Sequence, residues 1–217
     1  MIELHNIDCM ELMRRYPDDY FDLSIVDPPY GIKQHKFSMY RKGKSDKGWD
    51  RRPPSKKYFD ELSRVSKKRI IWGGNYFVDY LKNSRCWLVW NKKKRGQLFV
   101  GLQLAYTNFD SSVRMFSRSH IEDYNQGIES IHPTQKPIAL YRWLLENYAK
   151  QGDKILDTHL GSGSSAIAAY QLGYDFVGCE LDKDYFEAME RRVKQAMKQT
   201  NLFQSAEVKQ AEQLQIF

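Results

Sequence analysis

One short segment of the chain has residue types suited to chemistry, Asp27-Pro28-Pro29-Tyr30, which follows an apolar run ending at Val26. The two prolines restrict the backbone and have no N–H to donate, so the segment forms a stiff turn. The Asp27 carboxylate and a proline carbonyl can accept hydrogen bonds from an exocyclic amino group, and the Tyr30 ring can stack on a flat heterocycle. The segment therefore indicates a site for an amino group on a purine or pyrimidine. Acceptors that hold both amine protons favour localisation of the nitrogen lone pair for attack.

A second candidate site is a glycine-rich loop. Gly161-Ser162-Gly163 follows a predicted strand and precedes a predicted helix, whose N-terminus offers free N–H groups to a ligand. Glu180 lies 19 residues after Gly161, at the end of the next predicted strand, where a carboxylate can bind ribose hydroxyls. The loop indicates a ligand that carries an adenosine ribose, and both NAD and S-adenosylmethionine satisfy it.

The elements that position these two sites are predicted from apolar patterns. Buried strands are expected at residues 2–5, 22–27, 69–73, 86–90, 154–157 and 175–179. Helices are expected within 55–67, 138–150 and 183–198, and a hairpin is expected between 103–108 and 112–117. This alternation indicates an α/β fold with an open, mostly parallel sheet covered on both faces. Ligands of such sheets gather at the carboxyl ends of the strands.

The length of 217 residues predicts one domain over residues 1–217, with a peripheral tail at 200–217. The net charge of +7 is unevenly placed, because residues 33–69 hold 14 lysines or arginines against four acidic residues, which is +10, and the rest of the chain is slightly negative. Aromatic residues are interleaved with these charges, so the loop 33–57 is a candidate polyanion contact, although a solvated lysine-rich loop is the alternative. The run Lys92-Lys93-Lys94-Arg95 has the same two interpretations.

The three cysteines are widely spaced and lack a C-x-x-C pair, which predicts neither a disulfide framework nor a zinc site. The five histidines are scattered, so no metal is expected. No apolar run reaches the length of about 18 residues that spans a bilayer. The sequence therefore predicts a soluble, cytoplasmic protein that does not contact membranes.

Three motifs resemble those of the amino-group DNA methyltransferases, which modify N6 of adenine or N4 of cytosine with S-adenosylmethionine. Asp27-Pro28-Pro29-Tyr30 matches their catalytic tetrapeptide, and Asp157 with Gly161-Ser162-Gly163 is similar to their cofactor loop. The segment from His132 to Pro137 is similar to the stretch that closes on the methionine end of the cofactor. The catalytic motif precedes the cofactor loop, as in the permuted β group. The chain departs from the family at Thr158 and His159, where proline and phenylalanine are usual.

The resemblance implies a Rossmann-like S-adenosylmethionine-dependent methyltransferase fold, with a mostly parallel twisted sheet, helices on both faces and a C-terminal antiparallel hairpin element. It implies catalytic roles for Asp27, Pro28, Pro29 and Tyr30. The implied cofactor-binding residues are Asp8, Cys9, Thr134, Lys136, Asp157, Gly161, Ser162, Gly163, Ser164 and Glu180. The expected DNA contacts are Lys33, Lys36, Arg41, Lys42, Lys44, Arg51, Arg52, Lys92, Lys93, Lys94 and Arg95.

The predicted activity is site-specific methylation of adenine N6 in double-stranded DNA, on a base flipped out of the duplex, because aspartate at the first motif position is typical of the adenine-N6 enzymes. A cytosine-N4 or RNA base methyltransferase, a protein glutamine methyltransferase, an NAD-dependent oxidoreductase and a non-catalytic nucleic-acid-binding module are the alternatives. About 100 residues separate the two motifs, which leaves little room for a recognition domain. We therefore expect a short target sequence or help from a second copy in a homodimer.

Overall fold

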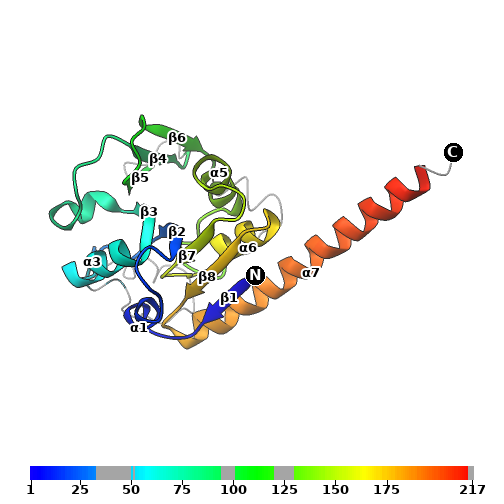
Figure 1. Cartoon of the computed structure of the whole chain (residues 1–217), viewed down its shortest axis with the longest axis horizontal. Helices are drawn as coiled ribbons and strands as arrows, with labels where there is room; N and C mark the ends of the chain where they lie inside the picture. Colours follow the sequence, from blue (N-terminus) through cyan, green and yellow to red (C-terminus); the bar gives the residue numbers. More distant parts are fainter. Residues whose placement is uncertain (33–49, 51, 94–100, 120–129, 215–217) are drawn as a thin grey trace.

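The computed structural model describes residues 1–32, 50, 52–93, 101–119 and 130–214. Its centre is an eight-stranded sheet with the order β1-β8-β7-β2-β3-β5-β4-β6 (Figure 1). The strands are β1 (Ile2–His5), β2 (Phe21–Val26), β3 (Ser66–Trp72), β4 (Trp87–Asn91), β5 (Leu102–Thr107), β6 (Arg114–Ser117), β7 (Lys154–Asp157) and β8 (Asp175–Cys179). The six strands predicted singly all occur, with bounds that shift by up to three residues.

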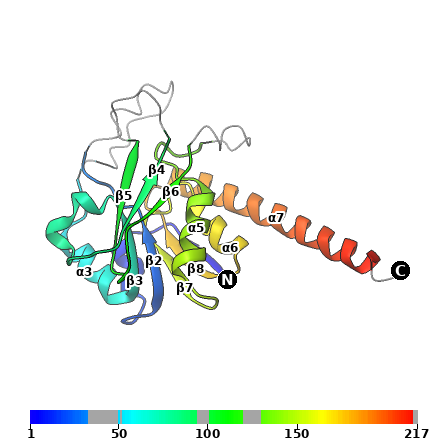
Figure 2. The same cartoon turned by 90° about the horizontal axis from the view of Figure 1, so that it is seen from above.

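Helices cover both faces of the sheet. The helices are α1 (Cys9–Arg14), α3 (Lys56–Val65), α5 (Ile138–Tyr148), α6 (Ser164–Gln171) and α7 (Lys183–Leu214), and two short 3-10 turns follow β3, η1 (Gly74–Tyr76) and η2 (Val78–Tyr80). One apolar cluster joins α5, α6 and α7 to the sheet, and a second joins α1 and α3 to it. Figure 2 shows α3 and α5 on opposite sides.

The alternation of side chains along the strands explains the two layers. In β3, Ile70 and Trp72 pack into the cluster with α5 and α6, whereas Ile71 packs into the cluster with α1 and α3. In β7, Ile155 and Leu156 divide in the same way. Strands buried on both faces in this way are expected to be continuously apolar, as the sequence shows.

The predicted hairpin between 103–108 and 112–117 is wrong. Strand β4 lies between β5 and β6, antiparallel to β5 and parallel to β6. Leu88 and Trp90 of β4 are fully buried, whereas β6 is largely exposed, so burial favours β4 inside the sheet and β6 at its edge. The antiparallel pairing of this sheet therefore lies mid-chain, in β3-β5-β4, and the C-terminal strands β7 and β8 pair in parallel.

Helix α7 is longer than predicted, since it continues to Leu214. Figures 1 and 2 show its C-terminal half projecting away from the sheet and the other helices. No helix in the described part of the chain combines the length and apolar character needed to cross a membrane. The predicted basic loop 33–57 lies outside the described residues except for Asp50 and residues 52–57.

Candidate active site

Four neighbouring strands, β1, β8, β7 and β2, run parallel and end at one edge of the sheet. Asp157 is the last residue of β7, and Asp27 and Glu180 directly follow β2 and β8. Asp8 lies three residues after the end of β1 and is the N-cap of α1. The parallel arrangement therefore brings the Asp27 turn and the glycine loop to the same edge, as the sequence predicts.

The Asp27 carboxylate is held through both oxygens. The Tyr30 hydroxyl donates to Oδ1 at 2.5 Å, and the Lys136 ammonium donates to Oδ2. Lys136 is 4% exposed, and its Nζ lies 5.4 Å from the centre of the Trp72 ring. Burial lowers the pKa of Lys136, and the Asp27 carboxylate opposes that shift. The first candidate site is therefore an ion pair in a mostly apolar setting.

Tyr30 is positioned by residues that sequence reasoning missed. The Gln103 amide at the start of β5 donates to the Tyr30 hydroxyl, and the Tyr76 ring stacks on the Tyr30 ring with centroids 5.0 Å apart. Burial and the nearby Asp27 raise the pKa of Tyr30, so its hydroxyl stays protonated and donates to the carboxylate. The polar Gln103 in an otherwise apolar strand was the only trace of this contact in the sequence.

Gly73 allows Tyr30 to lie against the end of β3. Its φ is +70°, and a Cβ there would lie 2.2 Å from Cε1 of Tyr30. We expect Gly73→Ala to lower the free energy of unfolding by about 1–3 kcal/mol, because the backbone is strained and the ring is displaced. Urea unfolding measures this. Gly152→Ala is the matched control, since Gly152 also has positive φ but nothing within 4 Å of its Cβ position. Equal losses in the two variants would contradict the steric argument.

Asp157, at the end of β7, holds both ends of the glycine loop by hydrogen bonds. The buried Asp157 carboxylate accepts hydrogen bonds from the Ser165 hydroxyl at 2.6 Å and from the His159 N–H at 3.0 Å. Burial raises the pKa of Asp157 to about 7, against the effect of these two hydrogen bonds. Gly163 precedes α6 with φ +74°, and a Cβ there would lie 2.6 Å from Met189 of α7. Only glycine fits this junction between loop and helix.

The two serines of the loop face α7. The Ser162 and Ser164 hydroxyls lie 3.2 Å apart, and the Arg192 guanidinium donates to the Ser162 carbonyl and the Ser164 hydroxyl. Arg192 is a further residue that the sequence did not single out. Its hydrogen bonds hold the glycine loop against α7, so the glycines stay at the carboxyl edge of the sheet.

Two further carboxylates lie beyond the ends of the paired strands β8 and β1. Glu180 accepts the N–H groups of Gly161 and Asp182, each at 3.0 Å, and burial raises its pKa. Asp8 is exposed and accepts the Met10 N–H at 2.8 Å. The Asn6 amide donates to the carbonyls of Glu180 and Leu181, which ties the two strand ends together.

The departures from the family pattern form a polar chain. The Tyr58 and Thr158 hydroxyls lie 2.7 Å apart, and the Thr158 hydroxyl lies 2.9 Å from Nδ1 of His159. Burial lowers the pKa of His159 to about 4, so its imidazole is neutral near pH 7. Thr158 and His159 therefore replace an apolar pair with neutral groups, of which Thr158 bonds both Tyr58 and His159.

The remaining predicted cofactor residues occupy the flanks of this edge. The Thr134 hydroxyl lies 3.1 Å from Nδ1 of His132, whose ring packs edge-on against Tyr185 of α7. Cys9 is half-buried, and burial raises its pKa to about 12, so the thiol is un-ionised. Among the described residues there is no group of three His, Cys, Asp or Glu side chains that could hold a metal ion.

Only three of the predicted DNA contacts lie within the described residues. Arg52 and Lys93 are exposed, and Nζ of Lys92 lies 4.7 Å from the Trp90 ring centre. Lys92 and Lys93 directly follow β4 at the same edge as Asp27. The other predicted contacts lie outside the described residues: Lys33, Lys36, Arg41, Lys42, Lys44, Arg51, Lys94 and Arg95.

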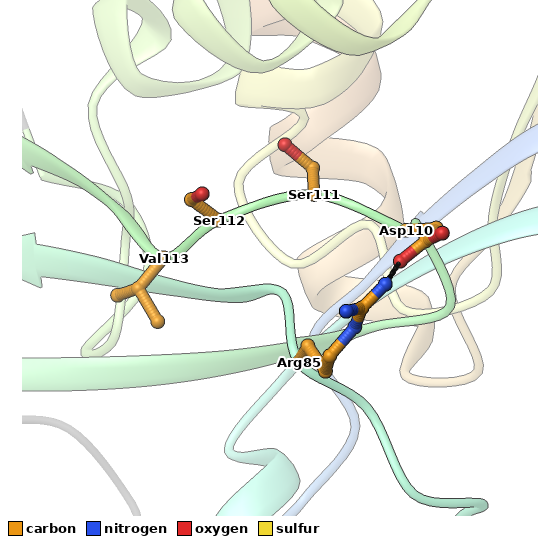
Figure 3. A pocket seen from close by; sticks show the side chains of 5 residues that line it. All are labelled: Arg85, Asp110, Ser111, Ser112 and Val113. Atoms are coloured by element: carbon orange, nitrogen blue, oxygen red, sulfur yellow. Dashed lines mark hydrogen bonds and ion pairs between the residues drawn. The ribbon is translucent and has the colours of Figure 1, made fainter.

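A surface pocket lies at the opposite edge of the sheet, where β4 begins and the chain passes from β5 to β6. Its lining residues are Arg85, Asp110, Ser111, Ser112 and Val113 (Figure 3). Arg85 forms an ion pair with Asp110 across it. This pocket is separate from the strand ends that carry Asp27 and the glycine loop.

Comparisons with known proteins identify the family and the fold. A family model for N6 and N4 methyltransferases, described as DNA methylase, matches residues 71–191. The type II methyltransferase M.HinfI of Haemophilus influenzae is 23% identical over 240 residues, covering 87% of this chain and 67% of that protein. The crystal structure of the M1.HpyAVI–SAM complex is similar with a TM-score of 0.60 and 16% identity, covering 88% of this chain and 100% of that one. The cytosine-N4-specific PvuII DNA methyltransferase gives a TM-score of 0.61 at 11% identity, with 92% of each chain covered. The expected methyltransferase fold is confirmed.

Proposed function

The chain belongs to the DNA methylase family of N6 and N4 amino-group methyltransferases, whose cofactor is S-adenosylmethionine, and we propose that it is a site-specific adenine-N6 DNA methyltransferase. The observation that carries the proposal is the aspartate at the start of the catalytic motif, since cytosine-N4 members typically have serine there. Asp27 lies beside the glycine loop, because β2 and β7 are neighbours in the sheet. Family membership removes the NAD-dependent oxidoreductase from the alternatives.

The residues at the carboxyl edge fit the proposed cofactor. Glu180 and Asp8 offer carboxylate oxygens at adjacent strand ends, and each oxygen that accepts one N–H retains a second lone pair. We propose that Glu180 binds the ribose hydroxyls and that Asp8 and Cys9 lie near the adenine. Gly161, Ser162, Gly163 and Ser164 form the loop along which the cofactor lies, and Asp157 supports that loop from inside the sheet. Thr134 would lie near the methionine end.

Positioning does most of the proposed catalysis. When bound, S-adenosylmethionine supplies an electrophilic methyl group on a sulfonium. Asp27 and the Pro28 carbonyl accept hydrogen bonds from the adenine amino group, while Pro29 keeps the turn rigid and Tyr30 stacks on the base. The amine nitrogen would attack the methyl carbon directly, so that the new N–C bond forms as the S–C bond breaks and S-adenosylhomocysteine leaves with that electron pair. The nitrogen then loses one proton, for which Asp27 is the adjacent acceptor. Holding the two reactants in line supplies the rate gain without a covalent enzyme intermediate.

The proposed substrate is double-stranded DNA with the target adenine flipped out. A stacked base cannot reach Asp27, and extrusion costs a few kcal/mol, part of which aromatic stacking offsets. We propose that the basic loop 33–57 and the run 92–95 contact phosphates, with a second copy of the chain contributing to recognition. Affinity for DNA should then fall as salt rises.

Methylated-base analysis tests the proposal. DNA is incubated with the protein and labelled S-adenosylmethionine, digested to nucleosides and separated, with RNA of the same sequence as the parallel substrate. We expect label in N6-methyladenine from DNA, at one short recognition sequence. Label in N4-methylcytosine, or label confined to RNA, would contradict the proposal and favour one of the alternatives.

A further inference from the structure

Lys136 joins a distant segment to the candidate catalytic carboxylate. It lies 109 residues after Asp27, directly before α5, and its ammonium donates to Oδ2 of Asp27. The side chains of Lys136 and Asp27 are 3% and 16% exposed. The family resemblance implies that Lys136 contacts the cofactor, whereas here its ammonium points at Asp27, the proposed hydrogen-bond acceptor for the target amine.

The surroundings leave Asp27 as the direct partner of this ammonium. The Trp72 ring covers one side of Nζ at 5.4 Å from its centre. Asp157 of β7 is the next carboxylate that acts on Lys136, and it is already bonded by Ser165 and the His159 N–H. The other titratable groups near the pair, Tyr30, Tyr141 and His159, are neutral near pH 7, because burial raises the pKa of both tyrosines and lowers that of His159.

We propose that Lys136 is a positioning residue for methyl transfer, which holds the Asp27 carboxylate through an ion pair and orients it toward the target amine. This inference rests on the proposed function of Asp27 as the amine acceptor. It differs from the role implied by the resemblance, because it assigns Lys136 to the binding of the target base through Asp27 and not to the binding of the cofactor.

The geometry of the carboxylate supports this role. Tyr30 occupies one lone pair of Oδ1 and Lys136 one lone pair of Oδ2, so rotation of the carboxylate plane is restrained from both sides. One lone pair on each oxygen remains for an amine proton. Without the ammonium, Oδ2 loses its donor and the carboxylate plane is restrained from the Tyr30 side alone. Lys136 therefore keeps the free lone pairs of Asp27 directed at the amine protons.

The experiment compares K136M, K136R and K67M. K136M removes the charge at similar length, and K136R retains a cation. K67M is the matched control, because Lys67 of β3 pairs with Asp22 of β2 at 2.7 Å but is 54% exposed and lies at the opposite edge of the sheet. Calorimetry measures S-adenosylmethionine binding, and single-turnover methyl transfer is measured at saturating cofactor and pH 7.

We expect K136M to bind S-adenosylmethionine within about threefold of wild type. Its single-turnover rate should fall roughly 100-fold at pH 7, because the Asp27 carboxylate is no longer held in position for the target amine. K136R should recover most of the rate, because it retains a cation beside Asp27, and K67M should match wild type.

The opposite pattern would overturn the inference. A K136M protein that binds the cofactor at least tenfold more weakly, yet transfers methyl at the wild-type rate once saturated, would make Lys136 a cofactor contact. If K136M does not fold, D27N/K136M should restore folding by removing both charges, and a double variant no more stable than K136M would contradict the pairing. Calorimetry and these unfolding measurements do not depend on which base is methylated. The Lys136–Asp27 pairing can therefore be tested even if methylated-base analysis contradicts the proposed function.

Discussion

Asp27→Asn is expected to lower the single-turnover rate of methyl transfer by roughly 10²–10⁴-fold while S-adenosylmethionine still binds. The asparagine keeps the shape of the side chain but replaces one acceptor oxygen by an NH₂ group. That group must face either the Tyr30 hydroxyl or the Lys136 ammonium, both of which donate to Asp27. The amide therefore turns away from its native orientation and cannot accept both the amine and its native partners.

Asp22→Asn is the matched control for this result. Asp22 lies on the same strand β2, accepts from Lys67 and from the Lys154 N–H, and sits at the edge opposite the active site. Methyl transfer by the Asp22 variant should equal that of wild type. Asp27→Ala should also abolish transfer, but it leaves the buried Lys136 ammonium unpaired and is expected to cost about 3–5 kcal/mol in stability. An active Asp27→Asn enzyme would refute the catalytic role.

The arrangement of the two motifs could be predicted from the sequence because it depends on a rule of topology. Buried strands ending at Val26 and Asp157 were recognisable from apolar runs, and neighbouring parallel strands must end at one edge. That β2 and β7 are immediate neighbours, which brings Asp27 close to the glycine loop, is a matter of strand order and is seen only in the structure. Local pattern and general topology were sufficient to predict the shared edge.

The contacts that organise Asp27 could not be predicted in this way. Gln103 reaches Tyr30 from β5 only because β5 lies next to β3, and the sequence indicated a hairpin between β5 and β6 instead. Tyr76 stacks on Tyr30 through a 3-10 turn that has no apolar periodicity. Residues so far apart in the chain meet according to strand order, which apolar patterning does not specify.

Thr158 and His159 illustrate a departure from the family motif whose physical basis is visible only in three dimensions. Tyr58, which lies in the helix predicted within 55–67, supplies the hydroxyl that Thr158 bonds. The same ring packs edge-on against His159. The change from an apolar to a polar pair is thus accommodated by a buried tyrosine 100 residues earlier, without introducing a charge near the cofactor loop.

Glu180→Ala is expected to raise the dissociation constant for S-adenosylmethionine by roughly 10–100-fold and to leave the rate at saturating cofactor nearly unchanged. Two effects combine. The ribose loses its acceptor, and the Gly161 and Asp182 N–H groups lose the carboxylate that holds the loop after β8 in place. Glu180 has its hydrogen bonds to the loop N–H groups and not to Asp27, Tyr30 or Lys136, so the positioning of the target base should be unaffected.

Calorimetry with S-adenosylhomocysteine and its 2′-deoxy analogue separates these two effects. Wild type should lose affinity for the analogue, whereas Glu180→Ala should bind both ligands equally, because its contact to the ribose is already absent. Glu187→Ala is the matched control, since Glu187 is an exposed residue of α7 that pairs only loosely with Lys183 at 3.9 Å. If Glu180→Ala still distinguished the two ligands as wild type does, the ribose contact would belong to another residue and Glu180 would serve only to order the loop. A carboxylate that binds both the loop and the ribose makes cofactor affinity depend on how the glycine loop is held, while the methyl-transfer step depends on Asp27 and its partners.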